Sequence, residues 1–438
     1  MSLRNDRPTV ALIDWCHLIE DFLDNLGVSC ETFQQEFEGS WIFGYMRAFQ
    51  AAGVRPIFFC VSARVTSPWR FTHRPTGCLI CVLPAPRVYR AIRRRVPNPY
   101  ATSVDQAVGL VGPVSRLFYT SLLITAPYLS TPLKCFAREL RRERCTAILC
   151  QEYENPRFDI CTLLGRLTNL PVFATFQGGQ IQYSPIERLF RRQALRSCAG
   201  LVVGSTVESQ RLQQRYDLPP SKISRIFNPI DVAIWRRTNQ EEARKELGIP
   251  ADARVVIWHG RVLFRRKGLD VLLDAWERVC RDRPNKNLML ILLGSGNDAN
   301  ELCRRIEATQ LQNVRWVNKF LSDTRTIVRY LSAADVYAFP SRHEGFPVAP
   351  LEAMSAGLPL VAAKAPGIAD IFENGEGSGG LIVPVADVTA FAGALGRLLD
   401  EDSWGRELGG RAQNRVQTSF SIEAIGAQLA ALLCGGGL

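Results

Sequence analysis

The chain has 438 residues, of which 47% are hydrophobic and 22% are charged. This composition is typical of a soluble globular protein, and the length suffices for two domains that each bury a core. A largely disordered chain is therefore excluded. The formal net charge of +11 comes almost wholly from residues 1–235, which hold 28 basic and 18 acidic residues.

Positive charge is densest in residues 40–150, which contain 16 basic and three acidic residues. The run Arg93-Arg94-Arg95 belongs to this segment. Such a surface suits an anionic membrane, a lipid phosphate or an anionic glycan, and peripheral membrane contact is one expectation. Nucleic acid is not an expected partner. The alternative is a solvated basic face without a partner.

Thirteen cysteines are scattered along the chain, and only Cys78 and Cys81 have the Cys-x-x-Cys spacing. Without a second pair, they predict a packed strand rather than a zinc site. The odd number of cysteines favours a reducing cytosol. The start, Met1 to Asp6, lacks the apolar core of a signal peptide. The protein is therefore expected in the cytoplasm, with peripheral attachment to the cytoplasmic face of a membrane as an option.

In the first half, short apolar runs alternate with helical segments. This alternation predicts a doubly wound parallel sheet, that is, a Rossmann-like domain. Between the first two runs, Gly39-Ser40 reads as a loop that opens a helix. The expected strands are Val10–Ile13, Pro56–Val61, Ala147–Cys150, Val172–Thr175 and Gly200–Val203.

Residues 62–135 interrupt the alternation. Prolines punctuate apolar and basic pieces that have no long period, so an irregular basic insertion that carries acceptor specificity is expected here. Within it, residues 117–133 form an uncharged run. This run contains two prolines and falls short of the ~20 residues that a membrane-spanning helix needs. Peripheral contact is the expectation for this segment.

The second half repeats the alternation after a polar linker near residue 236. It predicts a second Rossmann-like domain and a last helix over residues 422–433. A strand is expected to begin at Val255, and helices are expected over 269–280 and 388–399. The other expected strands are Leu288–Leu293, Val314–Val317, Val336–Phe339, Pro359–Ala363 and Leu381–Pro384.

Two carboxylates, Glu344 and Glu352, lie eight positions apart within residues 340–359. Glu344 falls in the loop after an expected strand, where open α/β sheets bind ligands. Pro347 suits the first position of a helix whose free backbone NH groups suit a phosphate. Each carboxylate can accept paired hydrogen bonds from sugar hydroxyl groups. From the spacing alone, solvated or salt-bridged glutamates remain the alternative.

Residues 340–359 read Pro-Ser-x-x-Glu-Gly-Phe-x-x-x-x-Leu-Glu-Ala-Met-x-x-Gly-x-Pro. This pattern closely resembles the signature of the family 4 retaining glycosyltransferases. Gly260-Arg261 and Lys267-Gly268 match a further motif of that family. The resemblance implies a GT-B fold, in which two Rossmann-like domains face each other across a cleft. Residues 1–235 would form the acceptor domain and residues 236–415 the donor domain, with a C-terminal helix within 416–438 that packs back on the first domain.

The resemblance also implies roles for individual residues. Glu344 would hold the hydroxyl groups of the donor sugar, while Arg261 and Lys267 would neutralise the diphosphate and thereby serve catalysis. Glu352 would bind the ribose. The other substrate-binding residues implied are Gly345, Phe346, Pro347, Val348, Gly39 and Ser40. No cofactor or essential metal is expected, because the one Asp-x-Asp sequence, Asp400 to Asp402, follows a predicted helix.

The implied activity is metal-independent, retaining transfer of a sugar, a hexose or a related one, from a nucleotide-sugar to a hydroxyl group. The acceptor would be a glycan, a lipid-linked molecule or a small molecule in polysaccharide, glycolipid or other glycoconjugate synthesis. The chain departs from the family where Gln151 to Tyr153 and Gln177 stand in place of common histidines. A catalytically impaired sugar- or nucleotide-binding module is therefore the alternative. A two-carboxylate hydrolase is disfavoured, because glycosidases need carboxylates that flank one bond.

Overall fold

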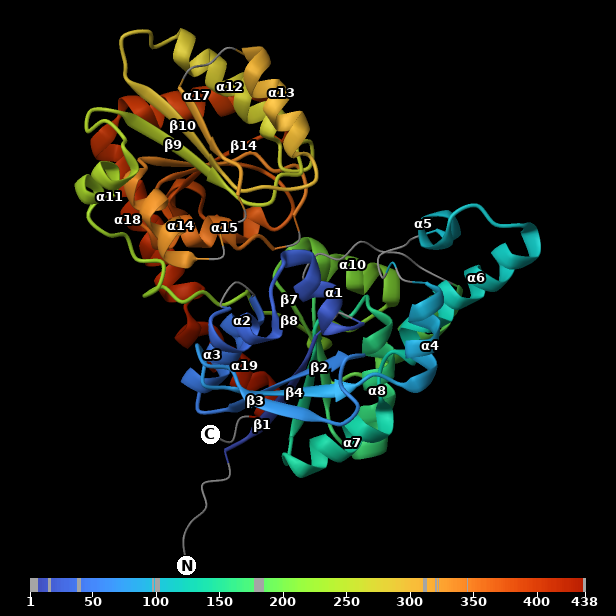
Figure 1. Cartoon of the computed structure of the whole chain (residues 1–438). Coiled ribbons are helices and arrows are strands. Elements are labelled where there is room, and N and C mark those ends of the chain that lie inside the picture. Colours follow the sequence, from blue (N-terminus) through green and yellow to red (C-terminus); the bar gives the residue numbers. More distant parts are fainter. Residues whose placement is uncertain are drawn as a thin grey trace, which may run out of the picture.

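The structure is a computed structural model that describes residues 7–14, 17–37, 41–96, 98, 103–176, 185–309, 313–319, 321, 323–344 and 346–435. Within these residues, the first half of the chain forms an eight-stranded sheet in the order β3-β4-β2-β1-β5-β6-β7-β8 (Figure 1). Neighbouring strands are parallel except for β3 and β4. The strands are β1 (Thr9–Ile13), β2 (Arg55–Ser62), β3 (Trp69–Thr72), β4 (Leu79–Pro84), β5 (Ala147–Cys150), β6 (Val172–Thr175), β7 (Gly200–Val203) and β8 (Ile223–Arg225).

Both faces of this sheet are covered by helices. Val10 and Leu12 of β1 pack in a cluster with α3, whereas Ala11 and Ile13 pack in a second cluster with α8. A strand buried on both faces has to be apolar throughout, which is why the sequence reads as continuous runs. The helices are α1 (Ile19–Leu23), α2 (Cys30–Gln35), α3 (Trp41–Ala51), α4 (Arg87–Arg95), α5 (Val104–Val108), α6 (Pro113–Thr125), α7 (Leu133–Arg142), α8 (Pro156–Thr168), α9 (Pro185–Ser197) and α10 (Thr206–Tyr216), with 3₁₀ turns η1 (Asp24–Leu26), η2 (Ala126–Leu129) and η3 (Pro220–Lys222).

Residues 62–135 are more regular than the sequence predicted. They contain β3, β4, α4, α5 and α6, and β4 pairs in parallel with β2 inside the sheet. The prediction of an irregular insertion is wrong because the prolines stand at the ends of elements. Pro84 ends β4, Pro86 precedes α4 and Pro113 begins α6. A proline lacks the backbone NH that an element interior needs, but a first turn tolerates it.

The second half forms a six-stranded parallel sheet, counted over the described residues, in the order β11-β10-β9-β12-β13-β14. Its strands are β9 (Arg254–His259), β10 (Leu288–Leu293), β11 (Val314–Val317), β12 (Val336–Phe339), β13 (Leu360–Ala363) and β14 (Gly380–Val383). Its helical elements are α11 (Gln240–Leu247), α12 (Leu269–Arg281), α13 (Ala299–Thr309), α14 (Thr324–Ala333), α15 (Ala349–Ser355), α16 (Ile368–Ile371), η4 (Gly375–Ser378), α17 (Val388–Asp400) and α18 (Asp402–Ser419).

The chain passes twice between the two sheets, and the two passages lie side by side. Ile230 donates a backbone hydrogen bond to the Phe420 oxygen over 2.8 Å, and Ile422 donates to the Ile230 oxygen over 3.1 Å. The last helix, α19 (Ile422–Cys434), then packs against α3 of the first half (Figure 1). A Cβ atom on Gly426 would lie 2.2 Å from the Ala48 oxygen, so this close packing requires glycine.

Candidate functional site

The site is built on two neighbouring loops at the carboxyl edge of the second sheet. β9 and β12 pair in parallel, so the loop after β9 and the loop after β12 leave the sheet side by side. Gly268, in the first loop, has a φ of +66°, and a Cβ atom there would lie 2.1 Å from the Pro340 oxygen in the second. Only glycine suits both the backbone conformation and the contact.

Arg342 ties the two loops together. Its guanidinium donates to both carboxylate oxygens of Asp270 over 2.6 and 2.8 Å, and its backbone NH donates to the Arg266 oxygen over 2.9 Å. Burial pushes the pKa of Asp270 upward, but the Arg342 hydrogen bonds and charge outweigh it, so the pKa lies below its ordinary value. The paired loops hold Lys267 and Glu344 in place.

Lys267 and Glu344 meet although 77 positions separate them. Lys267 Nζ donates to Glu344 Oε1 over 2.6 Å. The Glu344 side chain is 8% exposed and that of Lys267 is 19% exposed. The ammonium group has three donors and the carboxylate has about four acceptor sites, so each keeps capacity for a further partner. The pair can therefore present a cation and hydroxyl acceptors to one ligand.

Glu352 is held by His259, a residue that sequence reasoning missed. His259 ends β9, and its Nε2 lies 2.6 Å from Glu352 Oε2, where it donates to the carboxylate. Tyr337 packs edge-on against the imidazole at 5.3 Å between ring centroids. Its hydroxyl donates to the His259 backbone oxygen over 3.4 Å. A histidine at a strand end, directly before Gly260-Arg261, was the available signal in the sequence.

Tyr337 and the His259 imidazole are both buried. Burial raises the pKa of Tyr337 well above its ordinary value, and the nearby negative charge of Glu352 raises it further. His259 Nδ1 is buried without a hydrogen-bond partner in the described part of the chain. The imidazole is thus held by packing and by a single hydrogen bond to Glu352.

Arg261 follows Gly260 at the end of β9. Its side chain is exposed and makes no hydrogen bond or ion pair within the described residues. Arg265, in the same loop, does have a partner, because its guanidinium pairs with Asp270 over 2.8 Å. The structure therefore brings Lys267 to Glu344, whereas Arg261 stands on the same loop as an unpaired cation.

The helix after Glu344 begins later than the sequence predicted. α15 starts at Ala349, not at Pro347, and Pro350 lies in its first turn. A helix that began at Pro347 would place Pro350 where the first intrahelical NH must donate, and proline has none. Gly345, expected to bind substrate, lies outside the described residues.

The predicted substrate-binding segment 346–348 has its Phe346 side chain turned to the junction of the two halves. The ring stacks on Phe227 at 5.2 Å and lies 6.1 Å from Phe420. It also packs against Gly204, at the carboxyl end of β7. Pro347 is buried as well, and Val348 caps α15 without a side-chain hydrogen bond. The buried side chains of Phe346 and Pro347 therefore pack within the protein, whereas Val348 is half-buried.

On the first sheet, Gly39, Ser40 and Gln177 lie outside the described residues. Tyr153, which stands near an expected histidine position, is buried, and its hydroxyl contacts Glu208 and Arg211. Gln151 is also buried, and its Nε2 has no hydrogen-bond partner within the described chain. The Tyr153 hydroxyl is thus engaged within the protein, whereas the Gln151 amide keeps an unused donor.

The carboxylates of Asp400 and Asp402 form ion pairs with basic side chains. Asp400 contacts Arg283 over 2.7 Å and Lys286 over 2.5 Å, and Asp402 contacts Arg406 over 2.6 Å. Throughout the part of the chain that the structure describes, no group of three or more His, Cys, Asp or Glu side chains is arranged to hold a metal ion.

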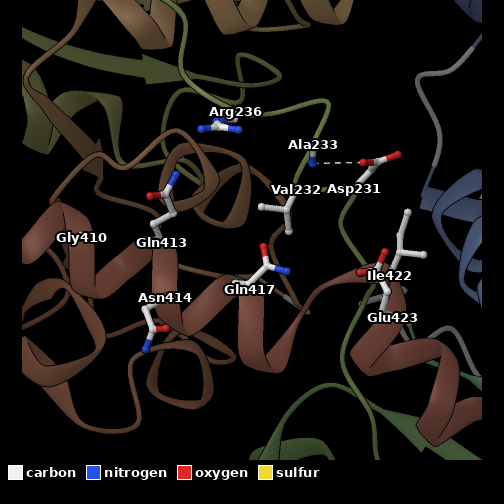
Figure 2. Close-up of a pocket in the computed structure, with 10 residues that line it drawn as sticks. All are labelled: Asp231, Val232, Ala233, Arg236, Gly410, Gln413, Asn414, Gln417, Ile422 and Glu423. Atoms are coloured by element: carbon white, nitrogen blue, oxygen red, sulfur yellow. Dashed lines mark hydrogen bonds between the residues drawn. The ribbon is translucent and has the colours of Figure 1, made fainter.

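A pocket of about 550 Å³ lies at the two chain crossings, away from the paired loops. Figure 2 shows Arg236, Gln413 and Gln417 around it, from the linker and from α18. The Asp231 carboxylate accepts a hydrogen bond from the Ala233 backbone over 3.2 Å at its rim. None of the predicted site residues lines this pocket.

The part of the chain that carries the paired loops is similar to known proteins. Residues 239–415 match the family described as glycosyl transferases group 1. D-inositol 3-phosphate glycosyltransferases of Corynebacterium glutamicum and Corynebacterium efficiens are 33% identical over 257 residues and 31% identical over 270 residues. The matches cover 57% and 58% of this chain but only 60% and 62% of the relatives, so the chain spans less than two thirds of their length.

Solved structures resemble the whole chain. Sucrose-phosphate synthase from Thermosynechococcus elongatus has a TM-score of 0.69 at 22% identity. The match covers 97% of this chain and 98% of the synthase chain. Anabaena HepE in complex with UDP has a TM-score of 0.65 at 16% identity, with 97% and 99% covered. At these identities the likeness concerns the fold, which is GT-B, as the sequence predicted.

Proposed function

We propose that the protein is a retaining glycosyltransferase, on the basis that residues 239–415 match the family described as glycosyl transferases group 1. It moves a hexose or related sugar from a nucleotide-sugar donor to a hydroxyl group of an acceptor. The observation that carries the proposal is the pairing of Lys267 with Glu344 and of His259 with Glu352, each over 2.6 Å, on loops at one edge of the sheet.

The charges of these loops suit a nucleotide-sugar. In the transition state, the bond to the sugar breaks and the leaving diphosphate gains negative charge, so fixed cations lower the barrier. Lys267 and Arg261 supply them. Glu344 accepts hydrogen bonds from sugar hydroxyl groups, and Glu352 accepts them from the ribose. Backbone groups of residues 345–348 assist at the sugar.

Retention follows if the acceptor attacks on the face from which the diphosphate departs. A diphosphate oxygen then takes the acceptor proton, and no covalent nucleophile on the protein is required. Metal independence is part of the proposal, since protein cations provide the charge. The ion pairs of Asp400 and Asp402 support it, because these carboxylates already have basic partners.

The acceptor is a glycan, a lipid-linked molecule or a small molecule, and the product belongs to polysaccharide, glycolipid or other glycoconjugate synthesis. The curated relatives are named for D-inositol 3-phosphate, which makes a phosphorylated polyol a first acceptor to test. The described cysteines are free thiols, many of them buried, which supports a reducing compartment such as the cytoplasm.

One observation favours a second candidate, a module that binds the donor without turnover. Tyr153 replaces a residue type expected on the acceptor side, and its hydroxyl is engaged by Glu208 and Arg211. Such a module would keep nucleotide binding through Lys267 but would lack an acceptor-side proton relay.

Release of free nucleotide from a panel of nucleotide-sugars tests the proposal. UDP-sugars come first, because the Anabaena neighbour was solved with UDP. The transferase should release nucleotide from one donor, faster with a phosphorylated polyol or a lipid-linked acceptor, and chelation of metal ions should not slow it. Binding of a donor without release would favour the binding module, and neither binding nor release would refute both.

A further inference from the structure

Helix α6 lies on the first domain with an apolar surface that the protein does not cover. None of its described residues is buried. Val114, Leu117 and Phe118 lie on one face of the helix and are 86%, 72% and 50% exposed. A helix of a globular protein ordinarily buries such a stripe against its core. Arg116, the one charged residue of α6, is paired with Asp105 over 3.0 Å.

Further exposed apolar side chains lie on η2, which follows α6 directly in the chain, and on α9. Leu129 of η2 is 42% exposed and Phe190 of α9 is 52% exposed. The Tyr128 ring of η2 lies 6.0 Å from the Phe190 ring, so these elements are neighbours. Exposed apolar side chains thus gather over three elements, and such a patch marks an interaction site.

Free arginines flank this surface. Arg87, Arg90 and Arg94 follow each other at helical spacing on α4, which packs beside η2. Arg188 and Arg192 do the same on α9. Among the described residues, none of these five guanidinium groups has a carboxylate or hydrogen-bond partner. Helices α4, α5 and α6 lie together at one side of the first domain (Figure 1).

We propose that α6, with the flanking arginines of α4 and α9, is a docking surface for an anionic lipid bilayer. Apolar side chains that enter the headgroup region, combined with cations that meet lipid phosphates, are what an interfacial helix requires. A second copy of the chain fits less well, because it would bring the same unpaired arginines to the contact.

The helix lies in the plane of the bilayer surface and does not cross it. A helix with the length of α6, Pro113–Thr125, spans about 20 Å, whereas the hydrocarbon core is about 30 Å thick. No helix within the described chain is both long and apolar enough to cross a membrane. The docking is therefore peripheral and depends on salt.

The position of the surface suits a lipid-linked acceptor. α4 follows β4 at the carboxyl edge of the first sheet. At this edge Gly204, after β7, meets Phe346 of the second half, so the edge faces the donor domain. The link between docking and a lipid-linked acceptor rests on the proposed function. The docking itself requires no transferase activity.

Sedimentation of the full chain with lipid vesicles tests the docking. We expect the protein to pellet with vesicles of phosphatidylcholine and phosphatidylglycerol at low salt, and to stay largely in solution at high salt or with phosphatidylcholine alone. Leu117→Glu/Phe118→Glu should abolish pelleting. Arg87→Gln/Arg90→Gln/Arg94→Gln should weaken it roughly tenfold or more, because each cation near the lipid surface contributes.

A control lies in the second half, in the loop after β14, where Val385 is 39% exposed. Val385→Glu should pellet like the wild type. Equal recovery with anionic and neutral vesicles would overturn the inference. A second result would also overturn it. Light scattering would show that the wild type is a dimer and that Leu117→Glu/Phe118→Glu is a monomer, while neither protein binds vesicles. The same variants should bind nucleotide like the wild type. A failure of membrane docking can therefore be told apart from a failure of the transferase proposal.

Discussion

His259 and Glu352 lie 93 positions apart in the sequence, yet His259 Nε2 and Glu352 Oε2 are 2.6 Å apart at the carboxyl edge of the second sheet. The histidine donates to the carboxylate and so fixes which of its oxygens remain open to a ligand. Because Glu352 is the proposed ribose ligand, we expect His259 to act on the donor through Glu352, as a positioning residue.

His259→Val should raise KM for the donor roughly tenfold, the loss of about one hydrogen bond to a charged group, with a smaller change in kcat. His259→Gln keeps an NH donor and should restore part of the affinity. Tyr337→Phe is the control, since this hydroxyl donates to a backbone oxygen and not to Glu352. An equal rise in KM for Tyr337→Phe and His259→Val would assign the effect to packing instead.

Arg261 has no ion-pair partner among the described residues, and Arg261→Ala should lower kcat roughly a hundredfold, as expected for the loss of one group that stabilises developing charge. Arg265→Ala is matched to it, because Arg265 lies in the same loop and is 75% exposed, and Asp270 keeps Arg342 as a partner. Steady-state kinetics with the active donor checks both. Equal losses in the two variants would contradict a specific role for Arg261.

Asp270→Asn should weaken the clamp between the two loops and lower the free energy of unfolding by about 1 kcal/mol at neutral pH. The pKa of Asp270 is depressed by Arg342, so its contribution is present above its ordinary pKa and is lost as pH falls through the folded value. The stability difference from wild type should thus stay constant above about pH 4 and shrink below it. Urea titrations at several pH values measure it, and a difference that grows on acidification would contradict the assignment.

Phe346→Ala should lower the free energy of unfolding by about 3 kcal/mol, because the ring is buried between Phe227, Phe420 and Gly204. Phe190→Ala removes a ring that is 52% exposed and should change stability by no more than about 0.5 kcal/mol. Equal effects would mean that the aromatic contact at the junction contributes little.

Much of the fold was predictable because buried parallel strands are apolar throughout. The strands at 147–150, 288–293 and 336–339 have the predicted bounds. β3 was missed because prolines in residues 62–135 suggested interruption, whereas the strand expected at Cys78 to Cys81 is confirmed by β4, which begins at Leu79 and continues to Pro84. The start of α15 was misplaced because Pro347 was weighed without Pro350.

The site was partly predictable for a different reason. The family motifs marked Lys267 and Glu344 separately, and the neighbouring strands β9 and β12 bring them together. The His259 contact to Glu352 depends on the register of those strands and on side-chain directions, which no local pattern in the sequence encodes. The inward turn of Phe346 likewise depends on how the two domains meet.

Calorimetric titration of the protein with UDP, GDP and ADP tests the central claim most directly. The wild type should bind at least one of them, and Lys267→Ala should weaken that binding tenfold or more, because one charged contact to the diphosphate is lost. Lys286→Ala, which also removes an ion-paired lysine, should bind like the wild type. Failure of the wild type to bind any of the three, or equal affinity in Lys267→Ala, would contradict the account.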